Sequence, residues 1–130
     1  MQDRPNVDEL LEAVAGFLHD DVLPNTTGRL SFHARVAGNV LQMLRRELAT
    51  EEEHLQREWT GLDALLGRAD RPQSLAQARA QLTERNQALA GLIRAGGADG
   101  APFREALFAH LRAVMRDKLG VSNPGLLAEG

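Results

Sequence analysis

The chain has 130 residues, of which 43% are hydrophobic and 25% charged, and its formal net charge is −3. These values are typical of one folded globular domain and exclude a disordered chain. The absence of cysteine excludes disulfide and thiolate chemistry, and it suits a reducing compartment. No apolar run approaches the ~18 residues of a membrane span, and the acidic first ten residues do not resemble a signal peptide, so we expect a cytoplasmic protein without a membrane partner.

The charge alternates in sign along the chain. Residues 1–27 have a net charge of −5, residues 28–48 of +3, residues 49–66 of −4, residues 67–95 of +3, and residues 96–130 are balanced. This alternation favours neighbouring helices within one molecule over a polyanionic partner. Nucleic-acid-binding proteins usually have one dominant basic face with aromatic stacking residues. Because aromatic residues make up 4% of this chain, we expect no nucleic-acid partner.

Five helices are predicted in chain order, and no segment has the alternation of a strand. The first begins at Asn6, which forms a capping-box pattern with Glu9, and it ends near Pro24. The second covers residues 28–48. Thr50, with Glu53 three residues on, predicts another capping box and therefore a third helix over residues 50–66.

Ser74 predicts the cap of a fourth helix, which ends at the glycines after residue 95. The fifth helix follows Pro102, and Gly120 is its predicted end. Short loops favour antiparallel neighbours. The sequence therefore predicts an all-α fold, a single domain over residues 1–130 built as an up-and-down bundle or array, with irregular termini at residues 1–5 and 121–130.

The second predicted helix is strongly amphipathic. At 100° per residue, one half of the helix carries mainly apolar residues, which predicts a core face. These are Phe32, Val36, Ala37, Val40, Leu41, Met43, Leu44 and Leu48. Three polar residues, Arg29, His33 and Glu47, interrupt that half. Polar groups on a core face must be paired or they cost stability, so these positions are the candidates for a role beyond packing.

Asp21, Arg29 and His33 form the first candidate cluster. Asp21 falls on the apolar side of the first helix near its end, and the other two lie one turn apart at the start of the second helix. An antiparallel turn would bring all three together. They could form a small charged pocket for an anion or ligand, or a polar lock that satisfies buried groups. We favour the lock, because buried polar groups are normally satisfied internally.

Two further sets of polar residues are candidates for pairing or for contact with a partner. Glu47 and Arg85 both fall on apolar halves of their helices, which predicts a structural ion pair, although both side chains could instead reach past the core into water. A second set follows one polar face of the second helix and is either solvated or faces another protein. Its members are Arg35, Asn39, Gln42 and Arg46.

The sequence contains no catalytic signature. Glu51 and His54 have the spacing of a di-iron helix, but that site requires a second Glu-x-x-His motif, which the chain lacks. Nucleotide-binding, zinc-binding and nucleophile-elbow patterns are also absent. We therefore predict no catalytic residue, no metal site and no cofactor, and the sequence argues against an enzyme.

Three segments, MQDRPNVDELLEAVAGFL, GRLSFHARVAGNVLQMLRREL and LRAVMRDKLGVSNP, resemble a family of small bacterial proteins known as a domain of unknown function. The resemblance implies genes that neighbour those of acyl-CoA dehydrogenases and of aminoglycoside-phosphotransferase-like kinases. It supplies no catalytic residues. We therefore expect a non-catalytic accessory or protein-interaction domain that serves such an enzyme. Its expected partner is another protein, and a homo-oligomer is compatible with this expectation. The alternative is a helical bundle that binds a small ligand or anion at Asp21, Arg29 and His33.

Overall fold

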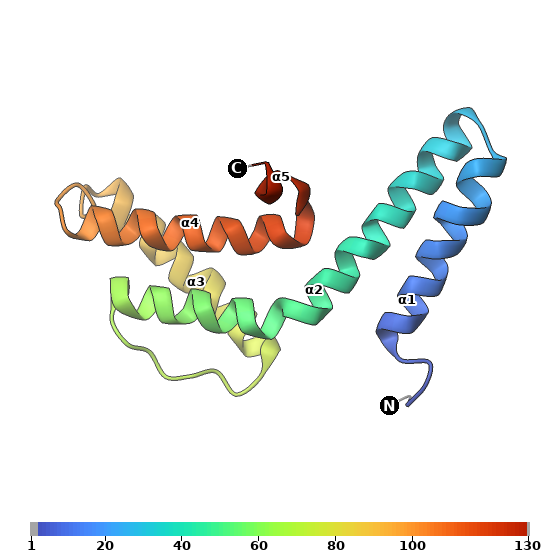
Figure 1. Cartoon of the computed structure of the whole chain (residues 1–130). Helices are drawn as coiled ribbons and strands as arrows, with labels where there is room; N and C mark the ends of the chain where they lie inside the picture. Colours follow the sequence, from blue (N-terminus) through green and yellow to red (C-terminus); the bar gives the residue numbers. More distant parts are fainter. Residues whose placement is uncertain (1–2, 130) are drawn as a thin grey trace. The chain divides into compact units, whose positions relative to one another are not determined.

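A computed structural model describes residues 3–129, which form five α-helices and, within that range, no strand (Figure 1). The prediction of an all-α fold is confirmed. The chain divides into two compact units, Met1–Ala49 and Thr50–Gly130, which we call unit 1 and unit 2. Their boundary falls within the longest helix, α2 (Gly28–Leu66). No helix in the described range has an apolar stretch long enough to cross a membrane.

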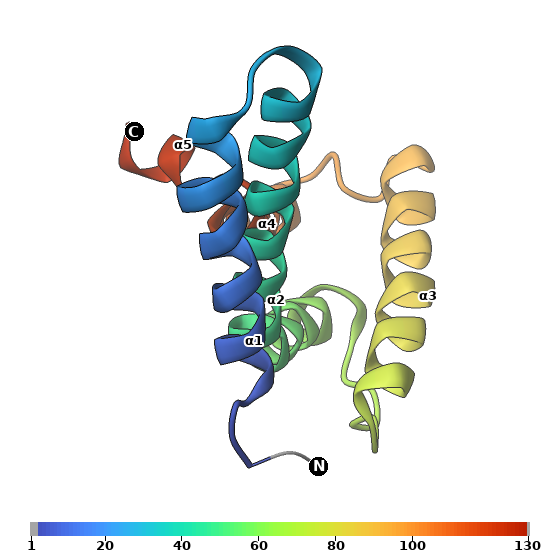
Figure 2. The ribbon, with the colours of Figure 1, turned by 90° about the vertical axis from the view of Figure 1, so that its right-hand side faces the viewer.

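Unit 1 is a helical hairpin. Its first helix, α1 (Val7–Gly16), continues into a π-helical turn, η1 (Phe17–Val22), and a 3₁₀ turn, η2 (Leu23–Asn25). The chain then reverses into the first part of α2, which runs beside α1 in both views (Figures 1 and 2). The predicted capping box is present, because the Asn6 side chain accepts from the Glu9 amide at 2.9 Å and the Glu9 carboxylate accepts from the Asn6 amide at 2.8 Å.

Small residues form the contact between the two helices of the hairpin. Ala15 on α1 and Ala34 on α2 are buried, and so is Gly38. A side chain on Gly38 would collide with the imidazole of His19. The glycine therefore leaves room for the His19 ring between the helices, and a larger residue at this position would require that ring to move.

An ion pair fastens the open end of the hairpin. The guanidinium of Arg45 on α2 donates to both carboxylate oxygens of Asp8 on α1, at 2.7 and 2.9 Å. It also lies 3.5 Å from the Glu12 carboxylate and donates to the Gln42 side chain at 3.2 Å. The hydrogen bonds from Arg45 hold the pKa of Asp8 below its usual range.

Unit 2 contains the second part of α2, then α3 (Leu75–Arg94), α4 (Phe103–Ser122) and a short α5 (Gly125–Ala128). The predicted cap of α3 is confirmed, because Ser74 accepts from the Gln77 amide at 3.2 Å. The hydrophobic core combines α2, α3, α4 and the loop between α3 and α4. Its buried members are Trp59, Leu62, Leu82, Leu89, Ala98 and Leu107.

Two predicted boundaries are wrong. Thr50 does not begin a helix, because α2 continues through it from Gly28 to Leu66. Residues 39–60 contain neither glycine nor proline, so nothing there interrupts the helix despite the capping-box pattern. Gly120 does not end α4, which continues to Ser122, and the tail expected to be irregular is helical again at Gly125–Ala128.

The glycines that do end helices are those with a left-handed backbone. Gly67 follows α2 with φ of 96°, and Gly96 follows α3 with φ of 80°, whereas Gly120 does not have a positive φ. The Gly97 amide also donates to the Leu92 carbonyl at 3.0 Å, which completes the C-terminal cap of α3. A glycine in a sequence therefore marks a helix end only where the backbone adopts this conformation.

Candidate functional site

The face of α2 that the sequence predicts to be in the core is exposed in unit 1. Phe32 is 60% exposed and Val40 is 47% exposed, whereas Leu41 is half-buried. The reason is geometric: two helices bury only the strip between them, and here that strip is lined by Ala34 and Gly38. The remaining apolar width of the helix is left uncovered.

Together with α1, this surface forms what we call the hairpin face. It is defined by the exposed large apolar side chains of the two helices. These are Val7, Leu10, Val14, Phe17, Leu30, Phe32, Val36, Val40, Met43, Leu44 and Leu48. A hollow of about 530 Å³ at one end of this face is lined by Pro5, Asn6, the start of α1, Arg45, Leu48 and Ala49. A contiguous exposed apolar surface is typical of an interaction site.

The structure brings Arg29 and His33 together on the hairpin face. The Arg29 Nε donates to His33 Nε2 at 3.2 Å, and both side chains are exposed. The ring of His33 also meets the edge of Phe32, with centroids 5.7 Å apart. Asp21 is exposed as well, and its backbone carbonyl accepts from Asn25 at 2.7 Å. The expectation that these groups face the core is therefore wrong, because the face that carries Arg29 and His33 is not covered.

The four residues of the predicted partner-facing stripe differ in their exposure to solvent. Arg35 and Asn39 are exposed, while Gln42 and Arg46 are half-buried. Gln42 accepts a hydrogen bond from Arg45 and so belongs to the ion-pair cluster of the hairpin. Only the first half of the stripe is thus open on the surface of α2, and contact with a partner through these residues stays a prediction.

Arg85, the predicted partner of Glu47, is instead bonded to Asp63 within unit 2, at 2.9 Å. It also donates to the Gly67 carbonyl at 2.9 Å, at the end of α2. Burial acts to raise the pKa of Asp63, but the Ala69 amide and Arg85 outweigh burial and leave that pKa below its usual range. Glu47 is exposed on the hairpin face.

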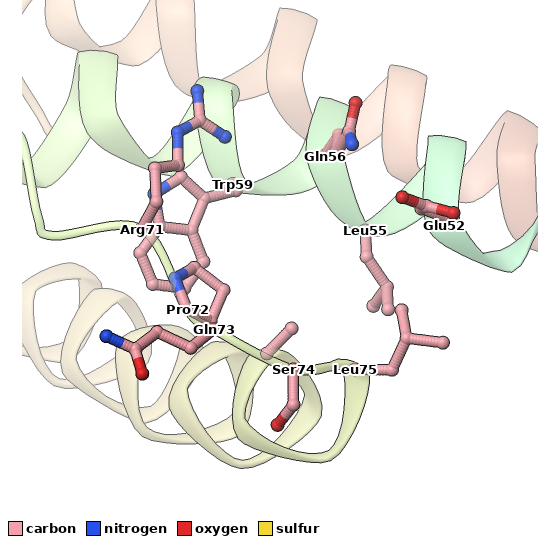
Figure 3. A pocket seen from close by; sticks show the side chains of 10 residues that line it. Glu52, Leu55, Gln56, Trp59, Arg71, Pro72, Gln73, Ser74 and Leu75 are labelled. Carbon is pink, nitrogen blue, oxygen red and sulfur yellow. The ribbon is translucent and has the colours of Figure 1, made fainter.

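A pocket of about 330 Å³ opens in unit 2 between α2 and the segment that leads into α3. Figure 3 shows Trp59 and Arg71 on one side of the pocket and Leu55 and Leu75 on the other. Arg71 donates to the Thr60 hydroxyl at 3.4 Å. The Glu52 carboxylate, Gln56, Gln73 and Ser74 line the same pocket, so its wall is mixed polar and apolar, with one group of each charge.

Glu51 and His54, which have the spacing of a di-iron helix, each contact a charged residue of unit 2. Glu51 accepts from Arg79 on α3, and His54 lies 3.9 Å from Asp117 on α4. Asp117 in turn receives two hydrogen bonds from Arg57, at 2.7 and 3.1 Å. Among residues 3–129, no three histidine or acidic side chains are grouped as a metal site would require.

The outer side of α4 carries a second exposed apolar surface, which we call the α4 stripe. Phe108, Leu111 and Met115 repeat at three- and four-residue spacing and are 52%, 38% and 54% exposed. Helical spacing places the exposed basic residues Arg104 and Arg112 on the same half of the helix. The stripe is therefore apolar with a positively charged border.

Two ion pairs between helices, Arg45 with Asp8 and Arg57 with Asp117, were not predicted from the sequence. Their members are 37 and 60 residues apart, so no local spacing could have paired them. The pocket at Trp59 was also missed. In the sequence, the pocket was indicated only by the single tryptophan of the chain, Trp59, and by Pro72 in the loop that follows its helix.

The fold, with its two units of packed helices, defines an all-α protein. Residues 24–126 match the model of the family described as domain of unknown function (DUF6285). The match covers most of the chain, so the protein belongs to this family. No curated protein and no solved structure matches the chain.

Proposed function

We propose that this protein is a non-catalytic accessory domain that binds another protein through the α4 stripe. The observation that carries the proposal is the exposure of Phe108, Leu111 and Met115 on a helix whose neighbouring side, which carries Leu107, is packed in the core. An amphipathic helix with a second apolar strip of this spacing is a common way to contact a partner protein. Large apolar and aromatic side chains also contribute most of the binding free energy at interfaces.

The charge around the stripe supports a partner with an acidic border. Arg104 and Arg112 are exposed, and arginine is well suited to bind carboxylates at the border of an interface. We therefore propose a partner whose binding surface is apolar and bordered by acidic side chains. The resemblance described above supports an enzyme encoded nearby, either a phosphotransferase or one that handles acyl-CoA, in the bacterial cytoplasm.

The test is affinity purification of the tagged full chain from its native host, followed by mass spectrometry. We compare the wild type with the double variant Phe108→Ser/Met115→Ser. The matched control is Ile93→Ser, which replaces an exposed apolar residue of α3 outside the Trp59 pocket. The proposal expects one enzyme to be captured by the wild type and the control and lost with the α4 variant. Capture that ignores the α4 substitutions, or no specific capture, contradicts it.

A second candidate function, binding of a small ligand, is favoured by the pocket at Trp59. Its volume of about 330 Å³ is at the lower end of the range of known ligand sites. This replaces the predicted position at Asp21, Arg29 and His33. Because Trp59 is the only tryptophan, its fluorescence reports directly on the pocket. Saturable quenching by a small carboxylate, abolished by Arg71→Ala, would support this function, and an unchanged spectrum across a panel of carboxylates would reject it.

A further inference from the structure

Two residues of opposite charge lie at the ends of the exposed apolar surface of α2. Arg29 and Glu47 are both exposed and are eighteen positions apart, which is five complete turns of an α-helix. Their side chains therefore leave the helix in the same direction, about 27 Å apart along its axis. They are two of the polar residues that interrupt the apolar half of this helix.

The apolar residues between them are arranged symmetrically about the midpoint, Gly38. Phe32 and Leu44 lie six positions on either side of it, and Val36 and Val40 lie two positions on either side. All four side chains are exposed, by 42% to 60%. The order of residues along the middle of this face is thus one positive residue, four apolar residues and one negative residue, with His33 beside Phe32. Read in the reverse direction, the apolar positions coincide and the positive and negative ends exchange places.

We propose that the hairpin face binds a second copy of this chain, with the two α2 helices antiparallel and a two-fold axis at the level of Gly38. A two-fold interface uses the same surface on both subunits, so that each contact occurs twice. In this register Arg29 of each copy meets Glu47 of the other at both ends of the interface. Phe32 then lies opposite Leu44, and Val36 opposite Val40.

The composition of unit 1 explains why a second copy is needed. The residues that its two helices bury between them are alanine and glycine, which contribute little hydrophobic free energy. A small helical unit with so limited a core commonly gains its stability by oligomerisation. Pairing two hairpins through α2 covers the apolar strip between Arg29 and Glu47, which lies on the side of α2 opposite the buried Gly38 and so points away from α1. Interfaces of about 20–30 residues a side are the usual size for a stable complex.

Charge also selects this register over other pairings of the same face. The helical residues of α1 and η1 include five acids and no lysine or arginine, so contacts that place these acids together are repulsive. An in-register parallel pairing of α2 would place Arg29 next to Arg29 and Glu47 next to Glu47. Only the antiparallel arrangement puts an attractive pair at each end, and ion pairs at such positions set orientation in helical assemblies.

The experiment is sedimentation equilibrium of the full chain, repeated with charge-reversal variants. We expect the wild type to be a dimer, and Arg29→Glu and Glu47→Arg each to raise the dimer dissociation constant about tenfold or more, because each replaces two attractive pairs with two repulsive ones. The double variant Arg29→Glu/Glu47→Arg restores the pairs and should return the constant close to that of the wild type. The matched control, Arg35→Glu, reverses an exposed charge of α2 outside this face and should leave dimerisation unchanged.

A wild type that stays monomeric over the accessible concentrations overturns the proposal. So does a dimer whose dissociation constant is equally affected by the double variant and the single ones, because that excludes the Arg29–Glu47 register. Far-UV circular dichroism checks the fold of each variant, and if a single variant loses helix content, the double variant alone decides the question. The outcome is independent of the partner proposed for the α4 stripe, since no residue is shared between the two surfaces.

Discussion

The guanidinium of Arg85 lies over the ring of Trp59, with its central carbon 4.7 Å from the ring centroid. The same guanidinium bonds to Asp63 and to the Gly67 carbonyl, so one side chain joins α3 to the end of α2. Only a planar cation can stack on an aromatic ring and donate in its own plane at once. This position therefore requires arginine rather than positive charge alone.

Arg85→Lys should lower the free energy of unfolding by about 1–2 kcal/mol, since the ammonium cannot keep both the stacking and the in-plane bonds. Arg79→Lys is the matched control, because Arg79 makes an ion pair with Glu51 and its side chain is 58% exposed. Urea denaturation followed by Trp59 fluorescence measures both changes. Equal midpoints for the two lysine variants would show that the stacking on Trp59 is not a stabilising contact.

The sequence correctly predicted the starts of two helices, at Asn6 and Ser74, because each start depends on a hydrogen bond between neighbouring residues. Asn6 and Ser74 cap helices because their side chains reach amides three residues ahead, and both are followed directly by helical residues. Thr50 has the same type of pattern but lies within α2. A cap signal begins a helix only where the preceding residues have left the helical conformation, and that condition is not contained in the motif.

The helical wheel of residues 28–48 identified which residues share a face but not what covers that face. Val36 and Val40 are on the apolar half as predicted, and they are exposed because unit 1 contains one other helix, which packs on Ala34 and Gly38. Amphipathicity is a property of one segment, whereas burial depends on the number and placement of the neighbours. Arg29, His33 and Glu47 were therefore placed correctly on one half of the helix, but that half is exposed in the structure instead of forming part of the core.

Ser74→Ala should destabilise the protein by about 0.5–2 kcal/mol, the usual cost of a lost N-cap. Ser74→Asp keeps an acceptor for the Gln77 amide and should retain most of the stability. Denaturant midpoints of the two variants and the wild type give the comparison. If alanine and aspartate have the same effect, the hydrogen bond of the Ser74 side chain does not contribute to the stability of α3.

His110 makes the stability of unit 2 dependent on pH. It is the buried polar residue of the core of unit 2, and burial lowers its pKa more than the nearby Glu58 raises it. The unfolded chain therefore binds the proton more readily than the folded protein does. The stabilising effect of the neutral imidazole is complete above the unfolded pKa of about 6.5. That effect is lost as the pH falls from there through the lower pKa of the folded protein. His110→Gln should remove this part of the decline. Urea midpoints between neutral and mildly acidic pH measure it, and identical profiles for both proteins would contradict the assignment.

Gly61 and His110 pack so closely that the first must be glycine. A methyl group on Gly61 would collide with the His110 ring, which comes from α4 and is buried against this part of α2. Gly61→Ala should therefore cost about 1–3 kcal/mol through overpacking, although alanine is intrinsically the better helix residue. Gly91→Ala is the matched control, because a Cβ there meets no atom within 4 Å and the substitution should be neutral or stabilising.

In the double variant Gly61→Ala/His110→Ala the collision is absent, so the two changes should cost less together than the sum of their separate effects. Strict additivity in a double-mutant cycle would mean that the two residues do not determine the spacing of α2 and α4.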